Sequence, residues 1–220
     1  MRRGAPARMA GGGVKVALDV SPLRQTRAGT ARYLNGLLDA GLPGVDLHPV
    51  AFGGSGRVAA GVRDTVWYPG VLPFVAGGAD VLHCPTYRAP LRSRTPVVVT
   101  VHDLAVFRYP ETFRLWTRSY SRALVPRVVR AARRVIAVSE FTKRELVELL
   151  GVDEERVRVV PNAVAAVFSP EGRAAEGDFV LAVGTLEPRK NLPRLAAAAQ
   201  RLGVELRVVG ARGWGRVELP

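Results

Sequence analysis

The sequence contains few of the residues that build disulfides or cysteine-ligated metal centres. Among 220 residues there is a single cysteine, which excludes a disulfide framework and a cysteine-based metal site. Cys84 lies in the apolar run ADVLHC, and this context favours a small buried residue over a nucleophile. No cluster of carboxylates indicates a metal site either, so we expect no metal.

Long apolar runs and nucleotide fingerprints are also missing. No run reaches the length of a membrane span, and residues 1–13 (MRRGAPARMAGGG) lack the apolar stretch of a signal peptide. We therefore expect a cytoplasmic protein with a disordered start over residues 1–13. The GxGxxG fingerprint and the GxxxxGK[ST] phosphate loop are both missing, so the sequence predicts no NAD cofactor.

Positive charge, in contrast, is in large excess. The chain has 32 basic and 19 acidic residues, a formal net charge of +13. Such a surface suits nucleic acid, anionic lipid or phosphorylated substrates, but an arginine-rich composition is also a habit of some genomes, and both interpretations stay open. Against nucleic acid, the arginines are spread along the chain and no recognised nucleic-acid-binding motif occurs.

Strand-like apolar runs alternate with helix-like stretches, a pattern typical of parallel α/β architecture. The strands of a first domain are predicted at residues 14–20, 45–52, 79–84, 96–103, 134–139 and 156–161. Its helices are predicted at residues 30–41, 112–132 and 140–150, while the glycine-rich residues 53–79 are predicted to be irregular.

The chain divides into two parts by this pattern. Residues 161–178 (PNAVAAVFSPEGRAAEGD) read as a linker, after which a strand, a helix and a strand recur (FVLAVG, LPRLAAAAQRLG, VELRVVG). We therefore predict a Rossmann-like domain over 14–160 and an incomplete second domain over 179–220, since two strands and one helix are too few to be stable alone.

The most informative local motif is VGTLEPRKN, residues 183–191. An apolar strand runs into a turn that carries Arg189 and Lys190, and a helix begins directly after Asn191, which stands at the cap position. Two cations at a helix start oppose the helix dipole, which favours negative charge there.

These cations predict an anion site. Free backbone N–H groups at a helix start favour anions, arginine binds phosphate with two bonds, and open α/β sheets bind ligands at the carboxyl ends of their strands. The motif therefore predicts that a diphosphate binds at Arg189 and Lys190. The alternative is a surface turn whose cations pair with Glu187.

A second candidate site is VTVHD, where His102 and Asp103 follow a predicted central strand. Histidine donates or accepts a hydrogen bond near neutral pH, and aspartate orients a hydroxyl or takes its proton, so both are candidate catalytic residues. The alternative is that His102 merely caps the strand and Asp103 starts a turn. His83 also ends a strand and is a lesser candidate for the same cleft.

Taken in order, six segments resemble the family 4 retaining glycosyltransferases, which have the GT-B fold. The segments are AGTARYLNGLL, VTVHDL, FRYPETF, VIAVSEFTKREL, RVRVVPNAV and VGTLEPRKNL. The resemblance runs from about residue 14 to the end, and it implies two Rossmann-like domains that face each other across a cleft. The amino-terminal domain would hold the acceptor, and the other domain most of a nucleotide-sugar donor.

The resemblance also implies roles for particular residues on the donor side. Lys190 would contact the donor diphosphate with Arg189 beside it, and His102 would lie close to the donor sugar. Family members often place an arginine after the glycine of the strand, where this chain has Thr185 after Gly184, so part of that clamp is absent or supplied differently.

On the acceptor side, the matching loop reads AGTARY, where GIGRY-like forms are common in the family. Its candidate residues are Gly29, Thr30, Arg32 and Tyr33, of which Gly29 permits a close backbone approach. Ser139 and Glu140 at the start of a predicted helix are lesser candidates for the donor cleft.

We therefore expect a retaining glycosyltransferase that moves a sugar from a nucleotide sugar, GDP-mannose first, to a hydroxyl in glycan or glycolipid synthesis, without a metal. The family's pair of glutamates, E-x7-E, has no counterpart before Pro220, so we expect a chain truncated in the second domain and inactive by itself.

Other functions remain open on the sequence. One is an inverting transferase with Asp103 as general base. Another is a non-catalytic or degenerate module that binds a sugar nucleotide or nucleic acid. The stripe of Arg114, Arg118 and Arg122 is either a solvated helix face or a surface for anionic lipid on the cytoplasmic face of a membrane, which would fit a lipid-linked acceptor.

Overall fold

The computed structural model describes residues 13–25, 29–54, 56–113, 115–165, 168–169, 171, 177–213, 215 and 217. Within these residues the strands are β1 (Val14–Asp19), β2 (Val45–Val50), β3 (Val81–Cys84), β4 (Val97–Val101), β5 (Arg134–Ala137), β6 (Val157–Val159), β7 (Phe179–Val183) and β8 (Glu205–Val209). The helices are α1 (Gly29–Ala40), α2 (Arg57–Val62), η2 (Arg63–Val71), α3 (Leu72–Val75), α4 (Ala105–Arg108), α5 (Leu115–Ala131), α6 (Glu140–Leu150) and α7 (Leu192–Leu202). Short 3-10 turns occur at η1 (Ser21–Arg24), η3 (Pro110–Thr112), η4 (Glu154–Arg156) and η5 (Pro188–Lys190).

Six of the strands form one parallel sheet in the order β2-β1-β3-β4-β5-β6. Strand β4 is a run of valines and threonine because helices cover both faces of a parallel sheet, and Val99 and Val101 are fully buried. The order reverses between β1 and β3, and open sheets of this kind bind ligands beside such a reversal, at the carboxyl ends of the strands. The predicted Rossmann-like domain is thus confirmed in class.

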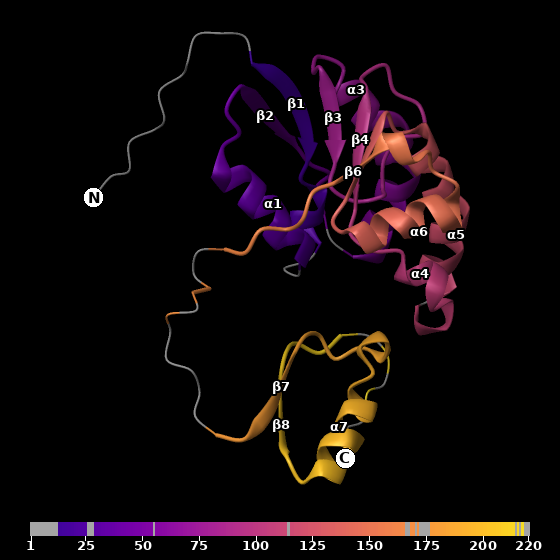
Figure 1. The fold of residues 1–220 in the computed structure, drawn as a ribbon. Helices are drawn as coiled ribbons and strands as arrows, with labels where there is room; N and C mark the ends of the chain where they lie inside the picture. The colour runs from indigo at the N-terminus through magenta and orange to yellow at the C-terminus, as the bar shows by residue number, and fades with distance from the viewer. Residues whose placement is uncertain are drawn as a thin grey trace.

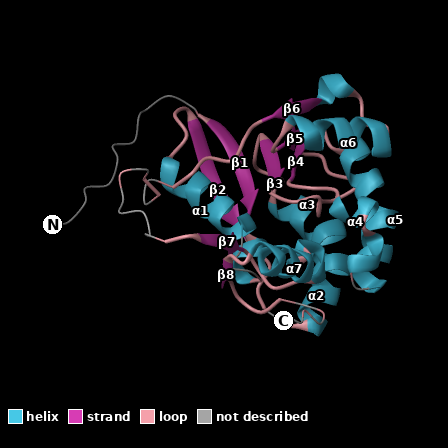
Figure 2. Cartoon of the chain, turned by 60° about the horizontal axis from the view of Figure 1, so that its bottom comes forward, coloured by secondary structure: helices cyan, strands magenta, loops and turns pink. Residues whose placement is uncertain are grey.

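The helices flank this sheet in two groups (Figures 1 and 2). Helices α4, α5 and α6 lie together on the side of β4 to β6, and α1 lies near β1 and β2. Helix α6 is capped at both ends, since Ser139 Oγ accepts a hydrogen bond from Thr142 N and Gly151 ends the helix with a φ of 61°. Among the described helices, none is both long and apolar enough to cross a membrane.

The prediction that residues 53–79 are irregular is wrong. Residues 57–75 are helical through α2, η2 and α3, of which η2 is a wide π-type stretch. Trp67, Tyr68 and Leu72 from this stretch are buried in the core, and burial of such side chains stabilises a helix that glycine and proline obscure in the sequence. The helix predicted from residue 112 begins instead at Leu115, after the turn η3.

The carboxyl-terminal residues form a small strand–helix–strand unit. Strands β7 and β8 are parallel and α7 connects them, as the repeated pattern predicts. Figure 1 shows this unit apart from the six-stranded sheet, across from the ends toward which the arrows of β1 and β3 point. The α/β class with a βαβ unit after a Rossmann-like sheet, the GT-B-type class predicted from the sequence, is confirmed. The predicted boundaries at 160 and 178 stay predictions, and residues 1–12 lie outside the described part of the chain.

Candidate functional site

A cavity of about 230 Å³ opens where the two parts of the chain face each other. The amino-terminal part contributes Thr30 from α1, Thr86 and Arg88 after β3, and His102 and Asp103 after β4. Arg189, from the turn after β7, lines the same cavity. The structure therefore brings Arg189 of the second motif to the first motif, more than 80 positions away in the chain. The other predicted diphosphate-binding residues, Gly184, Thr185 and Lys190, do not line this cavity.

His102 is held by its surroundings in one protonation state. Its Nε2 lies 3.0 Å from the carbonyl oxygen of Pro85, which only accepts, so Nε2 carries a hydrogen and donates it. Burial lowers the pKa of His102 below 6.5, against the opposing effects of the Pro85 carbonyl and Asp103. A neutral ring with a hydrogen on Nε2 has an unprotonated Nδ1, which is a hydrogen-bond acceptor at the cavity.

Beneath His102 lies a small polar group in the core. The ring of Tyr33 packs edge-on against His102 with centroids 5.2 Å apart, and its hydroxyl lies 3.3 Å from Thr100 Oγ1. The same Thr100 oxygen lies 2.9 Å from Nε2 of His83, which is buried and does not line the cavity. Burial, and secondly His102, lowers the pKa of His83 to about 4, so His83 supports the site from below as a neutral residue.

Asp103 lies at the cavity but also makes a local turn. Its Oδ1 accepts a hydrogen bond from the backbone N of Ala105 at 3.0 Å, the alternative that the sequence offered for this residue. The carboxylate is exposed, so one of its oxygens holds the start of α4 while the group as a whole remains accessible from the cavity.

The four predicted residues of the acceptor loop separate in space. Thr30 lines the cavity, and Tyr33 points inward to His102. Arg32 lies away from it, with its guanidinium 5.9 Å from the ring centre of Phe168 in the predicted linker. A Cβ on Gly29 would meet no atom within 4 Å, so no described part of the chain approaches this glycine closely. The expectation that a ligand approaches its backbone stays a prediction.

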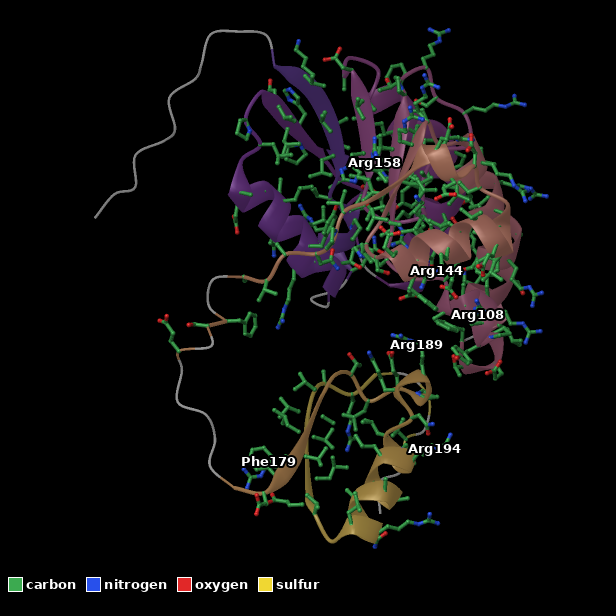
Figure 3. All side chains as sticks on the ribbon, viewed as in Figure 1. Arg108, Arg144, Arg158, Phe179, Arg189 and Arg194 are labelled. Carbon is green, nitrogen blue, oxygen red and sulfur yellow. The ribbon has the colours of Figure 1, made fainter. Side chains whose placement is uncertain are left out.

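The turn after β7 contains an ion pair whose carboxylate is buried. Glu187 is 3% exposed, and its Oε1 lies 2.6 Å from Nη2 of Arg189. The alternative interpretation of the motif, pairing with Glu187, is thereby confirmed for Arg189. Figure 3 shows Arg189 at the end of the carboxyl-terminal unit that faces the six-stranded sheet, opposite to the end that carries Phe179.

Lys190 differs from its neighbour. It is exposed and forms no ion pair with another described residue. Its Cε lies 3.7 Å from where a Cβ on Gly184 would be, so its stem crosses the end of β7 beside Thr185. Asn191 occupies the cap position of α7 with a φ of 49°, but its side chain makes no capping hydrogen bond. Pro193 has no N–H and Arg194 N donates to the carbonyl oxygen of Asn191 at 3.1 Å, so Leu192 N is the first-turn donor without a partner among the described residues.

Ser139 and Glu140 do not line the cavity. Ser139 is occupied as the cap of α6, and Glu140 is exposed in the first helical turn. Thr142 Oγ1 in the same turn lies 3.4 Å from the backbone oxygen of His102, so the start of α6 supports the backbone of the site.

Arg88 is a cavity residue that the sequence reasoning missed. Its Nε lies 3.3 Å from Oδ1 of Asp64, an oxygen that also lies 3.4 Å from Nε of the buried Arg63. Burial, the largest single effect, acts to lower the pKa of Arg88, but Asp64 together with nearby tyrosines offsets it and the pKa is raised. One carboxylate thus faces two guanidinium groups, and positive charge remains at the cavity wall. The sequence offers a signal for Arg88 as a site residue, because it follows the end of β3 by four residues and ligands bind at the carboxyl ends of parallel strands.

Asp19 is a second missed residue at the carboxyl end of a strand. It is fully buried at the end of β1, accepts from Ser21 N at 3.0 Å and from the hydroxyls of Ser21 and Tyr68. Burial raises the pKa of its carboxyl group against these hydrogen bonds. It does not line the cavity, and its partners indicate that it fixes the end of β1. Among the described residues, no three histidine, cysteine or acidic side chains gather where they could hold a metal ion.

Comparison with known proteins agrees with the family that the motifs indicate. Residues 44–166, more than half of the chain, match the family model described as Glycosyltransferase Family 4. The chain is 27% identical over 151 residues to O-antigen chain mannosyltransferase B of Escherichia coli, which covers 61% of this chain and 39% of that protein. It is 30% identical over 138 residues to O-antigen chain mannosyltransferase RfbU of Salmonella typhimurium, 60% of this chain and 37% of that protein.

A solved structure, Anabaena HepE in complex with UDP, aligns over 91% of this chain and 70% of that chain, with a TM-score of 0.49 and 16% identity. The alignments to the two mannosyltransferases span less than two fifths of the length of each of those curated relatives. Since the family model covers most of the six-stranded sheet and its helices, the resemblance stated from the motifs is confirmed, and this chain belongs to Glycosyltransferase Family 4.

Proposed function

We propose that the chain supplies the acceptor side and the first donor-binding elements of a retaining glycosyltransferase. The observation that carries the proposal is the single cavity shared by His102, from the end of β4, and Arg189, from the turn after β7. A nucleotide sugar whose diphosphate lies at that turn would place its sugar toward His102. An acceptor hydroxyl would then approach from the side of Thr30.

Lys190 is the proposed diphosphate cation. Its ammonium group is exposed and has no carboxylate partner among the described residues, whereas the charge of Arg189 is paired with Glu187. As the bond between sugar and phosphate breaks, negative charge grows on the diphosphate. Lys190 and the N–H of Leu192 at the start of α7 stabilise that charge and lower the barrier.

His102 is proposed to bind a hydroxyl of the donor sugar. Its lowered pKa keeps the ring neutral near pH 7, so Nδ1 accepts a hydrogen bond from a hydroxyl while Nε2 stays bonded to Pro85. The departing phosphate takes the proton of the acceptor, so the reaction requires no strong protein base. The proposal requires no metal either, since lysine and backbone N–H groups supply the positive charge.

Mannose from GDP-mannose is the proposed donor group, and a glycan or lipid-linked glycan in polysaccharide synthesis the acceptor. The support is that the two relatives described above are named as O-antigen chain mannosyltransferases. Peripheral contact with an anionic membrane on its cytoplasmic face is part of this proposal. It is supported by Leu115 and Trp116, which are 75% and 64% exposed at the start of α5, one turn from Arg118.

The test is a calorimetric titration of GDP, GDP-mannose, UDP and UDP-glucose into the chain, into Lys190→Ala and into Arg201→Ala. Arg201 is an exposed cation at the far end of α7 and serves as the matched control. We expect one nucleotide family to bind, a loss of about tenfold or more in affinity for Lys190→Ala, and no change for Arg201→Ala. If the folded chain binds none of the four, or if both variants lose affinity equally, the proposed diphosphate site is wrong.

An inverting reaction with Asp103 as general base makes a different prediction. Asp103→Asn keeps an oxygen for the hydrogen bond from Ala105 but cannot take a proton. In an assay of the transferase that contains this chain, a retaining reaction is expected to lose more activity from His102→Ala than from Asp103→Asn. The reverse order would favour the inverting mechanism.

A further inference from the structure

A second and larger hollow lies at the opposite edge of the six-stranded sheet. Its volume is about 540 Å³, and its walls are residues 90–97 up to the first residue of β4, residues 131–133 before β5, and Arg156 before β6. The cavity of the candidate site lies where β3 and β4 end, whereas this hollow lies where β4 to β6 begin. In a parallel sheet these are opposite edges, so a ligand here would not contact the glycosyltransferase site.

The walls of this hollow carry only positive charge. Four arginines line it, Arg92, Arg94, Arg133 and Arg156, and no acidic residue does. None of the four forms an ion pair with another described residue, in contrast to Arg88 and Arg189 in the other cavity. Like charges that converge on one hollow raise its positive potential and favour an anionic ligand. We name these residues and the space between them the arginine pocket.

Two of these arginines are positioned by the backbone. Arg133 N donates to the Val97 carbonyl at 2.7 Å, which places Arg133 beside the first residue of β4. Nη2 of Arg156 donates to the carbonyl oxygens of Arg130 and Ala132 at the end of α5. The guanidinium of Arg156 is therefore fixed before any ligand arrives, and less side-chain entropy is lost on binding.

A hydroxyl in the same wall has no partner. Ser93 Oγ is buried and makes no hydrogen bond with the part of the chain that the structure describes, although buried polar groups are nearly always bonded. The neighbouring hydroxyl of Thr95 is already used, since it donates to the Ala76 carbonyl at 3.0 Å. An unused donor beside fixed guanidinium groups is the kind of group that completes the binding of an oxyanion.

We propose that the arginine pocket binds a phosphate-bearing ligand, independently of the donor site. Guanidinium groups bind phosphate oxygens in pairs, and a serine hydroxyl donates one further hydrogen bond, so a phosphate monoester or a diphosphate matches this set of donors. The ligand is either a free phosphorylated compound or the phosphate of a lipid headgroup, and both present the same chemistry to the pocket.

The first test uses inorganic pyrophosphate as the probe and the full chain with Lys190→Ala, so that the donor site does not contribute. Calorimetry at about 0.15 M salt is expected to show saturable binding. Arg133→Gln is expected to weaken it about tenfold and Ser93→Ala about fivefold. Arg127→Gln, an exposed arginine of α5 outside the pocket, is the matched control and is expected to bind as tightly as the parent.

Two results would overturn the proposal. One is the absence of saturable binding by a chain whose circular dichroism is unchanged. The other is an equal loss for Arg127→Gln and Arg133→Gln, which would mean diffuse attraction to a basic surface. If Arg133→Gln fails to fold, Arg92→Gln on the exposed loop replaces it.

Vesicle sedimentation distinguishes a lipid headgroup from a free phosphorylated compound as the ligand of the arginine pocket. Vesicles of phosphatidylcholine with phosphatidylglycerol are sedimented with the parent and with Arg133→Gln. A loss of vesicle binding by Arg133→Gln assigns the pocket to a lipid headgroup. Equal vesicle binding by the two proteins, together with pyrophosphate binding that depends on Arg133, assigns it to a free phosphorylated compound. None of these outcomes depends on whether nucleotide sugars bind at Lys190.

Discussion

We expect replacement of His83 by asparagine to remove much of the acid sensitivity of this chain. His83 is buried beside Thr100, and burial, then His102, lowers its pKa to about 4 from the ordinary 6.5. The unfolded chain therefore binds a proton before the folded chain does, and the free energy of unfolding falls as the pH falls from about 6.5 toward about 4. At about 1.36 kcal/mol per pKa unit, the full penalty is about 3 kcal/mol, of which about 2 kcal/mol appears between pH 7 and about pH 5.

The assay is urea unfolding followed by circular dichroism at about pH 7 and about pH 5. His83→Asn leaves a small cavity and lowers the stability at both values, so the quantity compared is the difference between the two pH values, which should shrink by about 2 kcal/mol. The raised pKa of Asp19 acts in the opposite direction, but it is present in both proteins and cancels in the comparison. His48→Asn on the exposed face of β2 is the matched control and should keep the parental difference.

An equal pH difference in the parent and in His83→Asn would refute this reasoning. It would mean that the folded chain accepts the charged ring of His83 at little cost, through water or through a partner. The inference that His83 supports the site as a neutral residue would then fail with it.

Three further substitutions test the supports of the site. Ser139→Ala removes the hydrogen bond to Thr142 N at the start of α6 and should lower the free energy of unfolding by about 1 kcal/mol, measured by urea unfolding. Asp64→Asn leaves the buried Arg63 and the partly exposed Arg88 without a full counter-charge and should cost about 3 kcal/mol in the same measurement; a loss below about 1 kcal/mol would mean that solvent compensates both guanidinium groups. Gly210→Ala places a Cβ where it overlaps the carbonyl oxygen of Gly184, so the ends of β7 and β8 must separate. Proteolysis of the carboxyl-terminal unit should accelerate and nucleotide affinity should fall, whereas unchanged rates would show that the turn is not fixed by this contact.

Much of the fold follows from local sequence pattern. The apolar runs predict the strands because both faces of a parallel sheet are buried, and Ser139 and Gly151 mark the ends of α6 because their side chain and backbone satisfy helix termini locally. The helices within residues 53–79 do not follow from local sequence pattern. There the helical conformation depends on burial of Trp67 and Leu72 against distant strands, which glycine and proline in the local pattern conceal.

For the candidate site, the motifs can be recognised in the sequence without the structure. The segment VTVHD and the turn VGTLEPRKN are each recognisable because strand, turn and helix start occur within a few residues. The sequence also presented the two alternatives for Arg189, and pairing with Glu187 is local enough to be foreseen.

Which of these residues lie close together depends on the folded chain. In the folded chain Arg189 lines the same cavity as His102. Arg88 and Arg63 both lie next to one oxygen of Asp64, and His83 is buried in the core and does not line the cavity. These relations join positions that are distant in the chain, and they depend on strand order and side-chain packing. A sequence records propensity and charge at each position, but burial, shared partners and pKa values arise only when the chain folds and excludes water.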